Sequence, residues 1–230
     1  KDITAVEINP IIIQFADKLL SQEENIYYKD NVNLVVSEAR SFIENSDDKY
    51  SLIYIPSSKS YGASSITSYA LLENYLFTEE AFDTYLNHLT PDGIFAIADL
   101  NSFIERYIET GISTLINAGI NPAEHIFILG GKRTSIIIIQ KQEFSDIDKR
   151  NLITNSNSLG FAPRFLDEGD IHFYSTDYVP VTDNHPFFWN IYTLDNIIHP
   201  NKLKYSEYAS IYSILGPNLK YLFLLFFSIL

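Results

Sequence analysis

The chain has 230 residues, of which 46% are hydrophobic and 14% are aromatic. This composition excludes an intrinsically disordered tail and suffices for one large α/β domain, with or without appendages. The 16 Lys and Arg residues against 29 Asp and Glu give a net charge of −13, which repels phosphate backbones. We therefore expect no nucleic-acid partner. The absence of cysteine excludes disulfides, thiolate nucleophiles and Cys-based zinc sites.

Strand and helix patterns alternate through residue 120, which predicts parallel βαβ units in a doubly wound sheet. The expected strands are Ile3–Ile8, Asn33–Ser37, Tyr50–Ile55 and Ile94–Ala98, and the expected helices are Pro10–Leu20, Glu38–Asn45, Glu79–His88 and Asn101–Ala118. Pro10 suits a first helical turn, and Thr78 is a suitable N-cap for the helix that begins at Glu79. The sequence Thr90–Gly93 predicts a turn before the fourth strand.

The pattern changes at His125–Gln140, where two apolar runs are separated only by Gly130-Gly131-Lys132-Arg133. A connection this short cannot carry a parallel crossover, so it predicts an antiparallel hairpin. A parallel sheet that ends in such a hairpin resembles S-adenosylmethionine-dependent transferases rather than dehydrogenases. The expected fold is α/β, a Rossmann-like class I methyltransferase sheet, mostly parallel with a C-terminal antiparallel hairpin. After Phe144 we expect a helix at 145–159 and then a loop-rich segment with strand-like pieces.

The ends of the chain suggest a membrane-attached fragment. Residue 1 is not a methionine, so we expect that it is not the biological start. The apolar run Tyr221–Leu230 is about half as long as a bilayer span, and we interpret it as the beginning of a transmembrane helix, with a C-terminal core helix as the alternative. The expected organisation is a nucleotide-binding domain at 1–144, its C-terminal part at 145–194, a linker at 195–218 and the membrane helix from 219.

Two acidic residues follow predicted strands, and ligands of open α/β sheets bind outside the carboxyl ends of the strands. Glu7 ends the first strand, where a carboxylate can accept both hydroxyls of a ribose. Glu38 follows the second strand, where it can accept the exocyclic amine of adenine. The alternative for each is an acid that stabilises the N-terminus of the next helix. Two acids at consecutive strand ends are stronger evidence for a nucleoside site than either alone.

The third strand is followed by Pro56, Ser57, Ser58 and Lys59, with no carboxylate. Serines can hydrogen-bond a ligand, but without a nearby base they are not activated nucleophiles. We therefore interpret this segment as a polar loop without catalytic function.

Several motifs together resemble the spermidine synthase (aminopropyltransferase) family, and in particular its bacterial members fused to multi-pass membrane segments. They are AVEINP, VVSEARSFI, KYSLIYI and ENYLFTEEAFDTYLNHLTPDGIFAI. The resemblance covers about residues 3–140 and extends weakly to Thr182–Trp189, which is similar to the segment that closes such domains before the membrane.

The resemblance implies a cofactor-binding set of Glu7 with Ile8, Glu38 with Ala39, and Pro56 with Ser57. The implied cofactor is S-adenosylmethionine or its decarboxylated form, with no metal. Glu38 stands where the family usually has Asp. Pro56 and Lys59 stand where aminopropyltransferases place the acids that position or deprotonate the attacking amine. Proline cannot act as a base and lysine repels a polyamine cation, so we do not expect polyamine synthesis.

The resemblance also implies that the first strand of the fold, with its Gly-rich loop, is missing from this chain. No glycine occurs before Gly62. The additional strand would lie between Ile3–Ile8 and Tyr50–Ile55, at the centre of the sheet.

The histidines show no metal-ligand spacing; they are His88, His125, His172, His185 and His199. Asp183 and His185 precede an aromatic segment, which we interpret as packing against the sheet, with the border of a pocket as the alternative.

The leading hypothesis is a nucleotide-binding transferase domain that acts on an unknown acceptor, membrane-associated and on the cytoplasmic side. The alternative is a catalytically inactive regulatory or ligand-sensing domain of a transporter-like membrane protein. Both hypotheses are compatible with a homodimer. An NAD-dependent dehydrogenase shares the ribose-binding acid but is disfavoured by the hairpin.

Overall fold

The computed structural model describes residues 2–21, 23–56, 74–176 and 178–188. The strands are β1 (Ile3–Glu7), β2 (Val32–Val36), β3 (Tyr50–Ile55), β4 (Leu89–Leu100), β5 (Ile126–Gly130), β6 (Thr134–Gln140) and β7 (Ala162–Phe165). The helices are α1 (Pro10–Leu19), α2 (Ala39–Glu44), α4 (Glu79–Asn87), α5 (Asn101–Asn117), α6 (Asp146–Ser158) and α7 (Glu168–Ser175). Predictions for Ser57, Ser58, Lys59, the linker 195–218 and the apolar tail lie outside the described residues.

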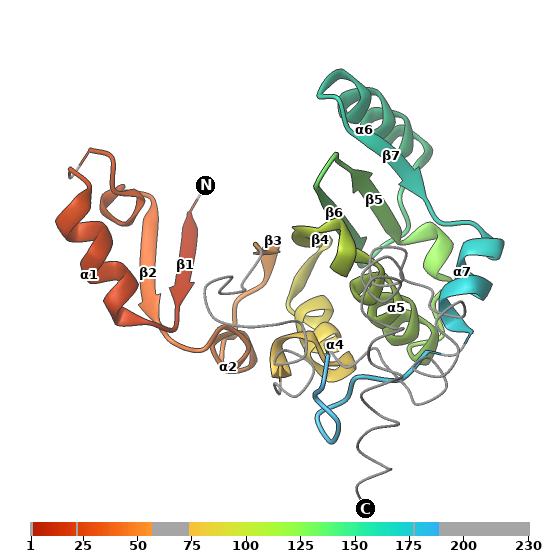
Figure 1. Ribbon diagram of the computed structural model, residues 1–230, viewed down its shortest axis with the longest axis horizontal. Helices are drawn as coiled ribbons and strands as arrows, with labels where there is room; N and C mark the ends of the chain where they lie inside the picture. Colours follow the sequence, from red (N-terminus) through yellow and green to blue (C-terminus); the bar gives the residue numbers. More distant parts are fainter. Residues whose placement is uncertain (1, 22, 57–73, 177, 189–230) are drawn as a thin grey trace, which may run out of the picture.

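The strands form two separate sheets. β1 pairs only with β2, in parallel, and the larger sheet has the order β3-β4-β6-β5-β7. In Figure 1 the β1–β2 pair and α1 lie to one side of the larger sheet, and α2 connects the two parts. The break falls between β1 and β3, where the resemblance predicts the additional strand. The two parts therefore share no backbone hydrogen-bond ladder among the described residues.

The larger sheet has the predicted mixture of parallel and antiparallel pairs. β3 and β4 are parallel, whereas β6 is antiparallel to both β4 and β5. The short connection between β5 and β6 forces the chain to reverse, which confirms the hairpin and the Rossmann-like fold class. β7 adds a further antiparallel strand beside β5.

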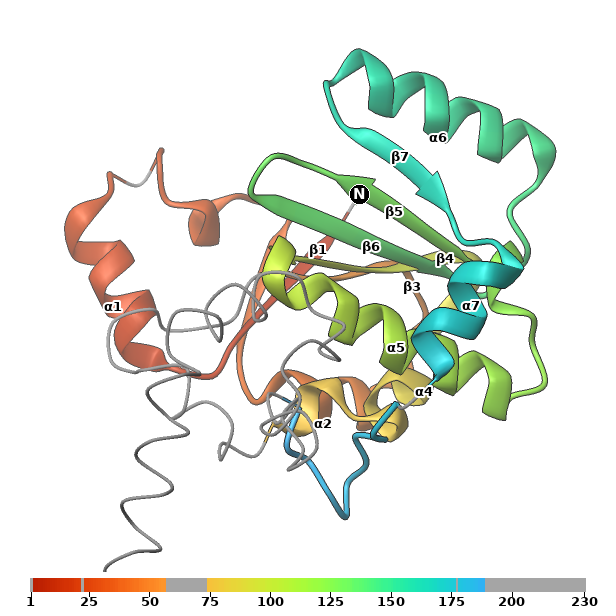
Figure 2. The ribbon, with the colours of Figure 1, turned by 45° about the vertical axis from the view of Figure 1, so that its right-hand side comes forward.

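The main core lies between the larger sheet and the layer of α4 and α5, which run along one face of it in Figure 2. Phe82 of α4 meets Phe95 of β4 edge-to-face, with ring centroids 5.0 Å apart, and both side chains are 0% exposed. Ile137 and Ile139 of β6 contribute fully buried side chains to the same cluster. Helix α5 thus covers the strands that continue from β4 into the hairpin.

A second, smaller core lies on the other face of the hairpin. Phe127 of β5 packs on Phe144 and Phe165, with ring centroids 6.4 and 4.6 Å away. Leu152 of α6 packs against this cluster, and α6 stands beside β7 in Figure 2. At the β3 end the corresponding face is open, and Tyr54 is 52% exposed.

The β1–β2 part is poorly buried. Helix α1 contains no buried residue, although Ile11, Ile12, Phe15 and Leu19 make it strongly apolar. A two-stranded sheet offers too little surface to bury such a helix, and isolated strand pairs are marginally stable in water. Tertiary packing in this structure therefore stabilises the larger sheet much more than the β1–β2 part.

The structure differs from the sequence prediction at two places. Thr90–Gly93 does not precede β4 but lies inside it, where the pairing with β3 shifts between Tyr50 and Leu52. A Cβ atom on Gly93 would be 2.8 Å from the Tyr50 carbonyl oxygen, so this close approach requires glycine. The segment predicted to be loop-rich with strand-like pieces contains the strand β7 and, in addition, the unpredicted helix α7, which begins with a capping box at Asp167.

Replacing Phe95 by alanine should lower the free energy of unfolding by about 3 to 5 kcal/mol, because it leaves a cavity beside Phe82. Phe15→Ala is the matched control: this side chain is 58% exposed, so its loss should change the free energy of unfolding by less than about 0.5 kcal/mol. Urea unfolding followed by circular dichroism measures both. Equal losses for the two variants would contradict the described packing of α1.

Candidate functional site

The structure brings Glu7 and Glu38 to neighbouring strand ends. Glu7 is the last residue of β1 and is in register with Val36, the last residue of β2. The Ser37 N–H donates to the Glu7 carbonyl oxygen at 3.2 Å, which extends the pairing to the residue before Glu38. Because β1 and β2 are parallel, both carboxylates belong to the same edge of this sheet.

Glu7 stabilises the turn that leads into α1. Its Oε1 accepts a hydrogen bond from the Asn9 N–H at 2.7 Å, and Asn9 in turn accepts from Ile11 N–H as the N-cap of α1. The other carboxylate oxygen of Glu7 has no hydrogen bond within the described part of the chain. A carboxylate has about four acceptor positions, so Glu7 keeps capacity for a ligand hydroxyl. Ile8, the next residue, is exposed.

Glu38 is the N-cap of α2. Its Oε1 accepts from the Arg40 N–H at 2.9 Å and its Oε2 accepts from the Ser41 N–H at 2.7 Å. This is the helix-capping role that the sequence analysis kept as the alternative. Ala39 is the first residue of α2. Each Glu38 oxygen retains a second lone pair, so capping does not exclude a hydrogen bond from an amine.

The ends of β3 and β4 offer no exposed carboxylate among the described residues. Pro56 follows β3 directly and is exposed, and Ser57 lies outside the described residues. Asp99 near the end of β4 is 1% exposed. Its oxygens accept from the Leu100 N–H and from the Tyr107 hydroxyl, each at 2.8 Å. Asp99 therefore fixes the junction between β4 and α5.

An ion pair that the sequence analysis did not predict lies next to Glu38. The Arg40 guanidinium donates from both of its terminal nitrogens to Asp183, at 2.6 and 2.7 Å. Thr78 Oγ1 donates to the same carboxylate at 2.8 Å, and the Arg40 side chain is only 13% exposed. Glu44 accepts from Arg40 Nε at 2.7 Å. The cluster thus joins α2, the start of α4 and the C-terminal segment.

This cluster shifts the ionisation of its members. The hydrogen bonds from Arg40, with a smaller contribution from Thr78, lower the pKa of Asp183 from its ordinary value of 3.8. The hydrogen bond to Asp183 likewise raises the pKa of Arg40. Both effects favour the charged forms, so the pair persists throughout the neutral pH range.

The aromatic segment after Asp183 packs into the core. Phe188 is fully buried and lies 5.0 Å from Phe77 and 4.7 Å from Tyr107, measured between ring centroids. The side chain of His185 meets Phe187 edge-to-face at 5.0 Å. Within the described ranges, no group of three or more His, Asp or Glu side chains is arranged to hold a metal ion.

A family model described as the spermine/spermidine synthase domain matches residues 1–127. Comparison with curated proteins found no match.

Three solved structures are among those to which the chain is similar. A probable spermidine synthase from Corynebacterium glutamicum is 15% identical, with 78% of this chain and 63% of that chain covered and a TM-score of 0.50. Spermidine synthase from Thermotoga maritima is 15% identical, with coverages of 86% and 59% and a TM-score of 0.45. Human methyltransferase-like protein 13, solved with SAH, is 17% identical, with coverages of 73% and 74% and a TM-score of 0.44. The chain spans less than two thirds of both spermidine synthase structures.

Asp183→Asn should lower the free energy of unfolding at pH 7 by about 1 to 2 kcal/mol. This value is smaller than that of a fully buried ion pair because the Asp183 carboxylate is partly exposed to solvent. The pKa of Asp183 is lower in the folded state than in the unfolded state, so its contribution is complete above the ordinary carboxyl range. The contribution is lost as the pH falls through the folded-state pKa.

Urea unfolding between pH 7 and pH 3 tests this dependence. The difference from the wild type should shrink below about pH 4, where the unfolded carboxylate becomes protonated. Asp47→Asn, at an exposed position, is the matched control and should have little effect at any pH. A difference for Asp183→Asn that grows toward low pH would be incompatible with the observed pair.

Proposed function

The chain belongs to the spermine/spermidine synthase domain family, and on that basis we propose that it binds a nucleoside of the S-adenosylmethionine type. The observation that carries this proposal is the placement of Glu7 and Glu38 at neighbouring, parallel strand ends, each with spare acceptor capacity. S-Adenosylmethionine and decarboxylated S-adenosylmethionine present the same ribose diol and the same adenine amine. The two acids do not distinguish between these cofactors.

Each acid has a specific role in the proposal. Glu7 would accept hydrogen bonds from the ribose hydroxyls through the oxygen that Asn9 does not occupy. Glu38 would accept a hydrogen bond from the exocyclic amine of adenine while it continues to cap α2. Ile8 and Ala39 supply the adjoining surface, and Pro56 with Ser57 would complete the site from the next sheet. If the domain is active, it transfers a methyl or aminopropyl group to an acceptor bound on the side of Ser57–Ser65.

A second candidate function is a catalytically inactive domain that senses the nucleoside. The specific support for it is that the sequence after β3, Pro56-Ser57-Ser58-Lys59, contains no carboxylate. Asp99, near the end of the adjacent strand β4, is buried and held by Tyr107, so it is poorly placed to receive a proton from an acceptor. Polyamine synthesis remains the least supported activity, because an amine nucleophile requires such a base.

Attachment to a membrane is part of the proposal and rests on the apolar run Tyr221–Leu230. This run lies outside the described residues. The described part of the chain has no helix whose length and apolar character suit it to crossing a membrane. In this arrangement the nucleotide-binding domain would face the cytoplasm, and the sensing alternative would act on a transporter-like membrane region.

Calorimetry with the full-length protein tests the proposal. We expect binding of S-adenosylmethionine, decarboxylated S-adenosylmethionine or methylthioadenosine, and no comparable binding of NAD. Glu7→Gln should weaken nucleoside affinity about 10- to 100-fold, because a charge-assisted hydrogen bond to the ribose is lost. Glu23→Gln, at an exposed position, is the matched control and should bind as the wild type does.

Two results would refute the assignment: binding of NAD alone, or unchanged affinity in Glu7→Gln. Incubation of the protein with S-adenosylmethionine and, separately, with decarboxylated S-adenosylmethionine, each with a panel of amine acceptors, separates the two candidate functions. Turnover supports the transferase, whereas tight binding without turnover supports the sensing domain.

A further inference from the structure

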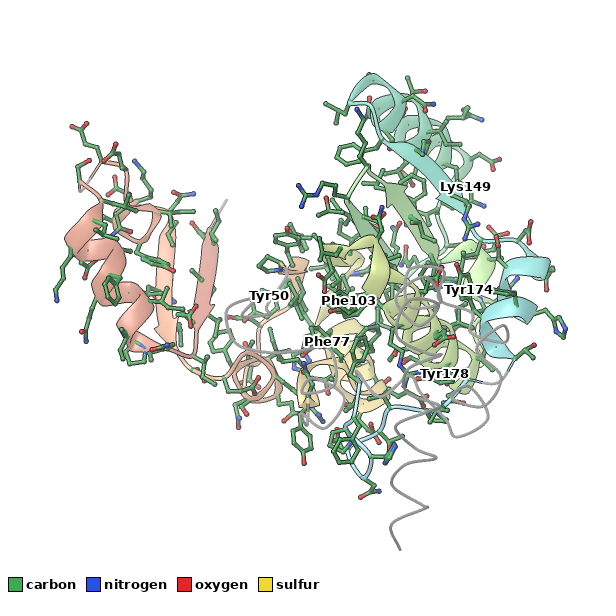
Figure 3. All side chains as sticks on the ribbon, viewed as in Figure 1. Tyr50, Phe77, Phe103, Lys149, Tyr174 and Tyr178 are labelled. Atoms are coloured by element: carbon green, nitrogen blue, oxygen red, sulfur yellow. The ribbon has the colours of Figure 1, made fainter. Side chains whose placement is uncertain are left out.

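The segment Tyr178–Phe188, here called the C-terminal strap, is fastened along its length to the helices of the larger sheet. The Glu79 N–H donates to the Val181 carbonyl at 2.8 Å, and Arg106 Nε donates to the Phe188 carbonyl at 3.1 Å. Val181 and Phe188 are fully buried. Tyr178, labelled beside α5 in Figure 3, is so desolvated that its pKa rises to about 12. The strap is therefore a fixed part of the domain.

One side chain of the strap reaches α2. The Asp183 carboxylate accepts hydrogen bonds from both terminal nitrogens of Arg40. The backbone N–H of Asp183 donates to Glu80 Oε2 at 3.0 Å. Arg40 also donates to the Tyr75 carbonyl at 3.1 Å and to Thr78 Oγ1 at 3.2 Å. A bidentate pair between a planar guanidinium and a carboxylate fixes orientation as well as distance.

The arginine of this pair belongs to the turn that holds Glu38. The backbone N–H of Arg40 donates to one Glu38 oxygen and that of Ser41 donates to the other. Because both oxygens are bound to this turn, any rotation of the turn moves the carboxylate with it. The direction of the Glu38 carboxylate is thus set by the position of the first turn of α2.

Packing alone holds this turn weakly. α2 has six residues, of which only Ile43 is buried, and it connects two sheets that share no strand pairing. The polar cluster around Arg40 is therefore a principal restraint on where its first turn lies relative to α4.

We propose that Asp183 is a positioning residue for the nucleoside site: through Arg40 it fixes the first turn of α2, and with it the Glu38 carboxylate that selects an exocyclic amine. This inference rests on the proposed function and extends it to the C-terminal strap. Asp183 itself does not contact the nucleoside. Its loss should therefore weaken selection of the base more than it weakens binding of the ribose.

The competing explanation is that the pair only fastens the strap and stabilises the fold. The ratio of the affinities for S-adenosylhomocysteine and S-inosylhomocysteine distinguishes the positioning role from the structural role. Inosine has no exocyclic amine that could donate a hydrogen bond to Glu38. A purely structural loss lowers both affinities in parallel and leaves their ratio unchanged. A positioning role changes the ratio.

The experiment measures both affinities by calorimetry for the wild type, Asp183→Asn and Glu44→Gln, together with the melting temperature of each. The wild type should prefer the adenine compound, and Asp183→Asn should reduce that preference about tenfold. Glu44→Gln is the matched control: it removes the other carboxylate on Arg40 but keeps the link to the strap, so the preference should persist. A lower melting temperature with an unchanged preference in Asp183→Asn would overturn the inference.

Arg40→Lys provides a second test that does not depend on the folding of Asp183→Asn. Lysine keeps the charge but loses the bidentate fork, so the preference for adenine should fall. Retention of the wild-type preference in Arg40→Lys would also overturn the inference. A wild type that binds neither compound overturns the proposed function and the inference with it. A wild type that discriminates, with variants that discriminate equally, overturns the inference alone.

Discussion

The ion pair between Arg40 and Asp183 joins parts of the chain that no strand pairing connects. Among the described residues the β1–β2 part and the larger sheet share no strand pairing, α2 connects them, and the first turn of α2 carries this pair. The Arg40 side chain is 13% exposed and the Asp183 side chain is 38% exposed, so solvent screens this pair less than a fully exposed surface pair. The arrangement of strand ends that the proposed nucleoside site requires therefore depends on a contact from the far end of the described chain.

The contrast between the two parts of the structure follows from burial. Helices α4 and α5 cover one face of the larger sheet. Phe82 of α4 packs edge-to-face on Phe95 of β4 between this helix layer and the sheet. The β1–β2 part has the same alternation of strand and helix but no comparable layer, and the apolar face of α1 is exposed. Secondary structure in this part is specified by local pattern and capping, whereas its place in the fold is specified by few contacts.

Local features of the fold were predictable from the sequence. The hairpin follows from the short Gly130–Arg133 connection, and the cap at Thr78 follows from side-chain chemistry; its hydroxyl accepts from the Ala81 N–H as expected. Helix α7 was missed although Asp167 and Asp170 form a capping box that the sequence shows. The site was predictable only in part. The strand-end acids could be found, but the partner of Arg40 could not, because 143 residues separate it from Asp183 and no local pattern encodes that contact.

The capping and binding interpretations of Glu7 and Glu38 are compatible, because each carboxylate satisfies backbone donors and retains acceptor positions. The most direct test of the account is a crystal structure of the protein with S-adenosylhomocysteine bound. The account predicts the ribose hydroxyls on Glu7 and the adenine amine on Glu38, with both caps intact. A nucleoside bound away from these two carboxylates, with Glu7 and Glu38 serving only as caps, would contradict it.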